Sequence, residues 1–183
     1  MRRLLFRSFV QGTLTEPAPA ADEAALAELA ARVSQASHRR LGRALAIREV
    51  DAGSCNGCEL EIHALGNALY DLERFGLRFV ASPRHADVLL VTGPVSANMR
   101  EALERTWRAT PDPKWVVASG DCARDGGVFA ASPACVGGVA KVLPVDLHIP
   151  GCPPTPQALL GGLLALLDSV AAGGAGAKTA RPG

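Results

Sequence analysis

The sequence of 183 residues is poor in aromatic side chains, carries almost no net charge and has no long apolar run. Aromatic residues make up 4% of the chain, while 48% of it is hydrophobic, which predicts a sizeable core of aliphatic side chains. A formal net charge of +1 argues against nucleic acid as the main partner. The most apolar stretch, Ala158–Ala172, is shorter than the ~20 residues that a helix needs to cross a bilayer. We therefore expect no transmembrane helix.

The first residues of the sequence do not have the pattern of a secretory signal peptide. Arg7 interrupts the apolar residues Leu4–Phe6 that follow Arg2 and Arg3, so this run is far shorter than the apolar core of a signal peptide. Five cysteines without a leader predict a cytoplasmic location, where clustered thiols are more often metal ligands than disulfides. Residues 1–48 hold eight arginines and four acidic residues, and we expect this basic segment to contact a partner or a membrane surface.

The apolar pattern predicts three segments. They are a basic arm with a short helix over residues 1–43, an α/β domain over 44–172 and a disordered tail over 173–183. Within the domain, strand patterns alternate with helical patterns. The strands are expected at 44–50, 77–80, 87–92, 115–118 and within 142–149. Helices are expected at 58–75, at 98–107 and from Pro156 onward, and a further helix at 23–35 precedes the domain. This alternation predicts a three-layer α/β fold with a mainly parallel, flavodoxin-like sheet.

Four of the cysteines come shortly after predicted strands. Cys55 and Cys58 follow the first strand, Cys122 follows the strand at 115–118, and Cys152 follows the last. Ligands of parallel sheets bind at the carboxyl ends of the strands, so we expect these four thiols to meet in one site. Four thiols suit either a [4Fe–4S] cluster or a structural zinc ion. Single cysteines on separate loops favour the cluster, and a non-redox zinc scaffold stays the alternative.

Several other residues invite a functional interpretation. Cys135 lies outside the pattern and is expected to be a buried thiol without a ligand role. Asp121 is either an ordinary loop carboxylate or, if close to a cluster, a charge that lowers its reduction potential. We expect His63 and His148 to be packed or surface groups rather than ligands. Gly93–Ser96 is expected to form a turn or to line a partner interface.

The cysteine motifs resemble those of a known family. Cys55-x-x-Cys58-Glu59, Gly120-x-Cys122 and Gly151-Cys152-Pro153-Pro154 are similar to the proximal-cluster motifs of [NiFe]-hydrogenase small subunits and of the related 20 kDa subunit of respiratory complex I. The resemblance runs from about Ile47 to Leu167 and is closest to the small subunit of formate-hydrogenlyase-type, membrane-associated hydrogenases. The complex I subunit carries its first two ligands as adjacent cysteines. The C-x-x-C spacing of this chain therefore favours the hydrogenase side.

The resemblance implies an electron-transfer subunit that is not catalytic alone. It would hold one [4Fe–4S] cluster on Cys55, Cys58, Cys122 and Cys152, since five cysteines complete one cluster, whereas the soluble hydrogenase small subunits carry three. Its partners would be a [NiFe]-type large subunit, a ferredoxin-like subunit and membrane-arm subunits, on the inner face of the cell membrane. The alternative is a complex I-like 20 kDa subunit that delivers electrons to quinone.

Acidic residues follow the first cysteine pair. Two acids in the first turn of a helix are often simply favourable to the helix dipole. The resemblance implies in addition an acidic residue near the cluster, where proton and electron movement couple. Glu61 is our candidate for this role, ahead of Glu59.

Overall fold

The structure, a computed structural model, describes residues 23–68 and 70–172. The predicted basic arm, with Arg2, Arg3 and Arg7, and the predicted tail over 173–183 lie outside these residues. The division of the chain at residue 43 likewise stays a prediction.

Five parallel strands form one sheet in the order β2-β1-β3-β5-β7. Their bounds are Leu45–Asp51 for β1, Leu77–Phe79 for β2, Val88–Thr92 for β3, Trp115–Ser119 for β5 and Leu147–Ile149 for β7. The central strand β3 is buried along its whole length, which explains its unbroken apolar sequence. Counted along the chain, the parallel strands follow the flavodoxin-like order. The predicted α/β fold is confirmed.

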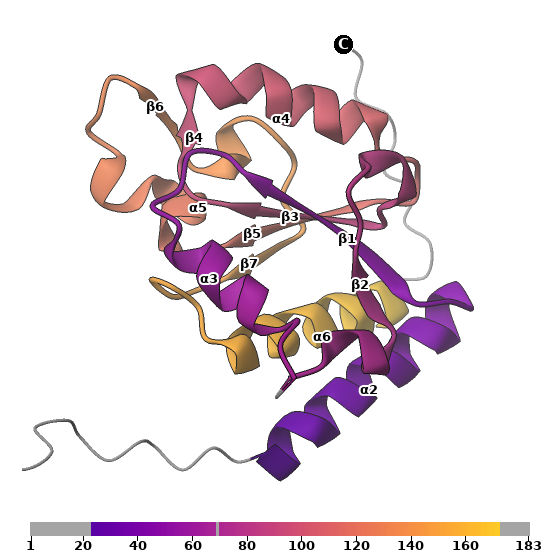
Figure 1. The fold of residues 1–183 in the computed structure, drawn as a ribbon. Coiled ribbons are helices and arrows are strands. Elements are labelled where there is room, and N and C mark those ends of the chain that lie inside the picture. The colour runs from indigo at the N-terminus through magenta and orange to yellow at the C-terminus, as the bar shows by residue number, and fades with distance from the viewer. Residues whose placement is uncertain (1–22, 69, 173–183) are drawn as a thin grey trace, which may run out of the picture.

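Helices cover both faces of the sheet (Figure 1). One face carries α2 (Glu23–Leu41), α3 (Gly57–Ala64) and α6 (Pro156–Ala172), and the other carries α4 (Ala97–Ala109) and the short α5 (Asp121–Asp125). Within residues 23–68 and 70–172, no helix is long and apolar enough to cross a membrane. The apolar stretch that begins at Ala158 instead packs on the sheet as α6.

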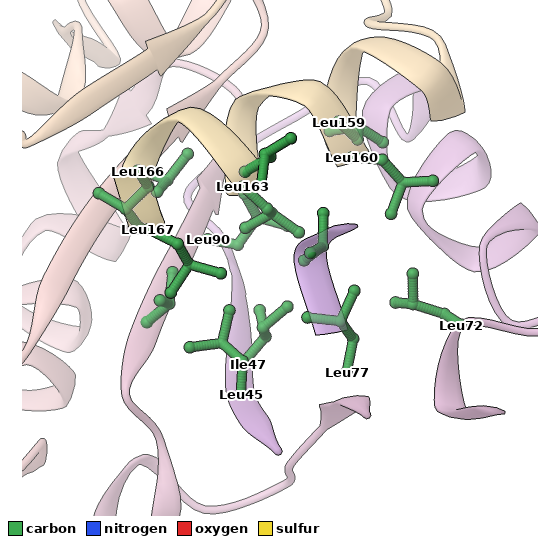
Figure 2. Packing of buried hydrophobic residues seen from close by; sticks show 14 of the residues in the cluster. Leu45, Ile47, Leu72, Leu77, Leu90, Leu159, Leu160, Leu163, Leu166 and Leu167 are labelled. Carbon is green, nitrogen blue, oxygen red and sulfur yellow. The ribbon is translucent and has the colours of Figure 1, made fainter. Parts of the chain in front are cut away.

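Leucines of α6 form the centre of the larger core (Figure 2). They face Leu45 and Ile47 of β1 and Leu77 of β2, and all of these side chains are at most 8% exposed. Burial of each such side chain stabilises the fold by about 1.5–3 kcal/mol. Helix α2 adds buried side chains to the same core, namely Ala30, Val33 and Ala36.

Several helix boundaries differ from the prediction. Helix α2 extends to Leu41 rather than to residue 35, and α4 ends at Ala109 rather than at residue 107. The helix expected over residues 58–75 ends at Ala64, because Gly66 and Asn67 form a turn in which the Asn67 side chain accepts a hydrogen bond from the Tyr70 N–H at 3.0 Å. A separate 3-10 turn then covers Leu72–Phe75. The helix expected to begin at Asn98 begins one residue earlier, because the hydroxyl of Ser96 caps it by accepting from the Met99 N–H at 3.3 Å.

A second, two-stranded sheet was not predicted. It pairs β4 (Val95–Ser96) with β6 (Cys135–Gly137) in antiparallel orientation, and Cys135 lies opposite Ser96. Strands of two and three residues are too short to show an alternating pattern in the sequence. This pair holds the long glycine-rich segment after α5 against the domain.

Two carboxylates bind backbone N–H groups at the amino end of the main sheet. Asp87 accepts hydrogen bonds from both terminal nitrogens of Arg43, at 2.9 and 2.6 Å, and from the Ala46 N–H at 3.0 Å. On the neighbouring strands, Asp146 accepts from the Val116 N–H at 2.8 Å. Each carboxylate thus links two segments of backbone where the strands begin.

Candidate metal centre

The loop after β1 carries the first two cysteines. One carboxylate oxygen of Asp51 accepts hydrogen bonds from the N–H groups of Gly53 and Ser54, at 2.8 and 2.7 Å, and this turns the chain sharply at the end of the strand. The turn places Cys55 on the surface and a half-buried Cys58 in the first turn of α3.

The loop after β3 packs closely against this first loop. A Cβ atom on Gly93 would lie 2.5 Å from the Cα of Ser54, and Gly93 has a left-handed φ of +68°. Only glycine satisfies both conditions. Gly93, Pro94 and Val95 are buried and Gly93 turns the chain, so the structure has the turn that was one of the two predictions for this segment.

The loops after β5 and β7 carry the other two cysteines and are tied together. The Asp121 N–H donates to the carbonyl of Gly151 at 2.9 Å, and the Gly151 N–H donates to the Asp121 carboxylate at 3.3 Å. Cys122 and Cys152, each next in sequence to one of these residues, are therefore held on adjoining loops. Asp121 has the loop role that was one of its two predicted interpretations.

Gly120 brings this pair of loops up to the first. Its φ of +90° is left-handed, and a Cβ atom there would lie 2.8 Å from the sulfur of Cys58. Its carbonyl oxygen lies 3.1 Å from the Nε2 atom of His148 on β7, so His148 is a packed group, as predicted.

The four thiols lie close enough to influence one another's ionisation. Burial, followed by the charges of Glu59 and of the other three thiols, raises the pKa of Cys58 to about 12. Burial also raises the pKa of Cys122, with further contributions from Cys152 and Cys55. The structure thus gathers the four predicted cysteines, from three loops, at the carboxyl end of the sheet.

In the part of the chain that the structure describes, no group of three or more His, Cys, Asp or Glu side chains is placed to hold a single metal ion.

The fifth cysteine, Cys135 on β6, is half-buried, so the expectation that it is buried is wrong.

The surroundings of the thiols fit an iron–sulfur cluster. An all-thiolate donor set is typical of such clusters. Glycines lie beside two of the sulfurs, since a Cβ atom on Gly120 would approach Cys58 and one on Gly127 would lie 2.6 Å from the sulfur of Cys122. The backbone can therefore come near the sulfurs without side chains in between, and exposed Cys55 and Cys152 leave the site open on one side.

Glu59 is a buried carboxylate whose burial the sequence did not reveal. It is 6% exposed, and neither carboxylate oxygen has a hydrogen-bond partner. Burial raises the pKa of nearby Glu49 on β1, an effect that the charge of His63 opposes and that of Glu59 reinforces. Glu61, the predicted proton-coupling residue, is half-buried two positions further along α3. No signal in the sequence predicted the burial of Glu59. The spacing of apolar residues in α3 does not show that the first turn of this helix packs against the loops that carry the cysteines.

With this geometry established, the relatives of the chain are informative. Residues 55–166 match the family described as "NADH ubiquinone oxidoreductase, 20 Kd subunit". The chain belongs to this family. The predicted resemblance is thereby confirmed.

Members of the 20 kDa subunit family from hydrogenases and from complex I are similar to the chain to nearly the same degree. It is 47% identical over 131 residues to a probable membrane-bound hydrogenase subunit of Pyrococcus furiosus, covering 72% of this chain and 78% of that protein. It is 48% identical over 124 residues to formate hydrogenlyase subunit 7 of Escherichia coli, covering 68% of this chain but only 49% of that protein. It is 49% identical over 114 residues to a subunit of the NADH-quinone oxidoreductase of Citrifermentans bemidjiense, covering 62% of this chain and 66% of that protein.

A solved structure agrees with the family assignment. A chain of the membrane-bound sulfane sulfur reductase, an archaeal respiratory membrane complex, superimposes with a TM-score of 0.65 at 34% identity, covering 79% of this chain and 78% of that chain. The relatives are thus subunits of hydrogenase and respiratory complexes of membranes.

Proposed function

We propose that the chain is a single-cluster electron-transfer subunit of a membrane-associated, formate-hydrogenlyase-like hydrogenase. One [4Fe–4S] cluster is held by Cys55, Cys58, Cys122 and Cys152. The observation that carries this proposal is the gathering of these four thiols, from three loops, at one end of the sheet. The similarity to hydrogenase subunits supports it.

When bound, the cluster supplies reversible one-electron chemistry. The chain itself binds and positions it. Because burial raises the pKa of the Cys58 and Cys122 thiols, both are protonated near neutral pH and release protons when they become ligands. The bonded loops of Asp121 and Gly151 keep Cys122 and Cys152 in place before loading.

The chain works between two partners. Electrons pass between a ferredoxin-like subunit and a [NiFe]-type large subunit, and the large subunit docks over the Cys58–Glu61 turn. Large apolar side chains next to the cysteines are exposed, with Leu60 64%, Val128 86% and Phe129 40% accessible. Exposed apolar side chains that gather around a site are typical of an interface.

The complex sits on the cytoplasmic face of the membrane, beside membrane-arm subunits. The basic residues of the arm, Arg2, Arg3 and Arg7, attach the chain to this assembly. Deleting residues 1–20 should leave the iron content unchanged and weaken attachment, more so at high salt, because exposed charges are screened. Equal attachment of the full and shortened chains at every salt concentration would contradict this role of the arm.

The decisive test is anaerobic purification of the full chain. We expect a brown protein with about four iron and four sulfide ions per chain, reducible by one electron, and without hydrogen oxidation, proton reduction or quinone reduction. Those activities should appear only with the partner subunits. Zinc without iron would establish the non-redox scaffold instead, and turnover by the lone chain would exclude a purely relaying role.

A second candidate is the complex I-like subunit that delivers electrons to quinone. The 49% identity to a subunit of an NADH-quinone oxidoreductase favours it, while the C-x-x-C spacing of Cys55 and Cys58 favours the hydrogenase. Isolation of the native complex separates the two. Nickel and hydrogen turnover in the large subunit identify the hydrogenase, and quinone reduction without nickel identifies the alternative.

A further inference from the structure

We propose that the turn Gly126–Phe129 tunes the reduction potential of the cluster by donating the Val128 backbone N–H to the sulfur of Cys122. Gly127 is the positioning residue that lets the turn reach this sulfur. The inference deepens the proposed function and rests on the cluster being bound.

The approach of the turn to the sulfur requires glycine. Gly127 has a left-handed φ of +51°, and a Cβ atom there would lie 2.6 Å from the sulfur of Cys122 and 3.2 Å from its Cα. Real Cβ atoms essentially never come within 3.0 Å of another heavy atom in this way. A side chain at this position would therefore push the turn and the sulfur apart.

The N–H groups around Val128 are already directed to oxygen atoms. The Gly126 N–H donates to the Cys122 carbonyl (2.8 Å), and the Gly127 N–H donates to the Asp125 carboxylate (2.8 Å). The Phe129 N–H donates to the Gly126 carbonyl (3.0 Å), and the Ala130 N–H donates to the Gly127 carbonyl (3.2 Å). These bonds fix the turn on the Cys122 segment. Among the described residues, the N–H of Val128 donates to none of these oxygen atoms, and the residue before it lies against the Cys122 sulfur. The sulfur is therefore the acceptor that we assign to this N–H, and the same N–H opposes the effect of burial on the pKa of the Cys122 thiol.

The side chain of Val128 takes no part in this contact. It is 86% exposed, so it points away from the sulfur that its own N–H meets. The contact therefore depends on the backbone of the turn rather than on the type of residue at position 128.

A hydrogen bond to a ligand sulfur favours the reduced cluster. Reduction adds one negative charge, and the positive end of an N–H dipole beside the sulfur stabilises the more negative state. The bond from Val128 thus raises the reduction potential, while the nearby carboxylate of Asp121 acts in the opposite direction. Removing the N–H should leave the cluster bound but harder to reduce.

The test deletes this single N–H in the full chain. Replacement of Val128 by its α-hydroxy acid converts one amide to an ester, so the side chain stays and the donor is lost. The ester also weakens the Gly127 carbonyl as the acceptor of the Ala130 N–H. The Gly127→Ala variant displaces the same donor by its Cβ. The midpoint potential is measured by redox titration followed by EPR, with iron counted in each sample. We expect the ratio of reduced to oxidised protein at a fixed potential to fall about tenfold, which is about 59 mV for a one-electron couple.

Two matched controls isolate the effect. The same ester at Phe129 removes an N–H that donates to an oxygen. Gly42→Ala introduces a side chain at a similar left-handed φ of +65° with no atom within 4 Å, and therefore imposes the backbone strain without the contact to sulfur. Both controls should keep the wild-type potential.

The possible results separate this inference from the proposed function. A wild-type chain that binds and reduces a cluster, together with a wild-type potential in the Val128 ester, would overturn the inference and leave the proposed function intact. A wild-type chain that binds no reducible cluster would overturn both. If Gly127→Ala fails to hold iron, the Val128 ester alone decides, and a lowered potential in that variant supports the inference.

Discussion

The two ends of the parallel sheet differ in how their buried carboxylates are bonded. At the amino end, buried Asp87 has its carboxylate fully engaged by Arg43 and by the Ala46 N–H. At the carboxyl end, buried Glu59 has no hydrogen-bond partner for either oxygen, and two of the four gathered thiols are exposed. Left-handed glycines at 93, 120 and 151 let the loops approach closely there.

This difference indicates how the fold divides its tasks. A buried polar group that is fully bonded stabilises a structure, whereas an unpartnered one costs about 1–3 kcal/mol. Such costs persist where the surroundings hold a residue in place, and they concentrate at functional sites. The amino end therefore secures the sheet, and the carboxyl end is shaped for binding. Substitutions at the two ends test this division.

The largest effect is expected from the cysteines themselves. Replacing Cys55, Cys58, Cys122 or Cys152 by serine should abolish stable cluster binding, because serine cannot supply the thiolate. Iron per chain, measured under anaerobic conditions, reports the result. Cys135→Ser is the matched control and should retain full iron. Full iron in the Cys122 variant with loss in the Cys135 variant would refute the ligand assignment.

Glu61→Gln should slow hydrogen turnover of the assembled complex by about 100-fold while the iron content stays unchanged, because the amide cannot carry a proton. Glu101→Gln on α4, whose carboxylate pairs with Arg105 on the exposed side of the helix, serves as the control. Wild-type turnover by the Glu61 variant would show that protons do not pass through this residue.

At the amino end, Asp87→Ala should lower the free energy of unfolding by about 2 kcal/mol, because it leaves the buried Ala46 N–H without its side-chain acceptor and Arg43 without its partner. Urea unfolding measures this effect. Glu101→Ala, which breaks only an exposed pair, should change stability by less than about 1 kcal/mol. Cluster binding by the Asp87 variant should be normal, and loss of iron would mean that the two ends are not independent.

The smallest effect concerns the chain without its cluster. The pKa of the Cys58 thiol is raised from 9.0 to about 12, so between these values the folded chain holds a proton that the unfolded chain has lost. The free energy of unfolding should therefore decrease as pH rises through this window, and Cys58→Ser should reduce the decrease. Urea unfolding at pH 8 and pH 10 compares the two proteins. In the cluster-loaded chain the ligand is already a thiolate, so this decrease should be absent.

Much of the fold could be predicted because the signals are local. The unbroken apolar sequence of β3 marks a strand buried on both faces, and alternation of strands with helices leads to the parallel sheet. The positions of the four cysteines followed from the same reasoning, since each comes shortly after a strand. Their gathering needed no knowledge of individual contacts.

The remaining features depend on contacts between distant segments. The pairing of β4 with β6 joins residues around Val95 and Val136 that show no strand pattern. The burial of Glu59 likewise arises only when the loops meet. The spacing of apolar residues along the sequence does not predict contacts of this kind. The end of α3 at Ala64 is a local exception, since it is set by a side-chain turn at Asn67 that helical spacing does not show.

The arrangement of the strands also sets an order of events during synthesis. The loop with Cys55 and Cys58 is made early and follows a strand near the middle of the sheet, whereas Cys152 follows β7, the edge strand, which pairs only with β5. A growing chain on the ribosome therefore lacks its last ligand until β7 has emerged and docked. Insertion of the proposed cluster must wait for that step, and a nascent chain stalled before Leu147 should present only three of the four thiols.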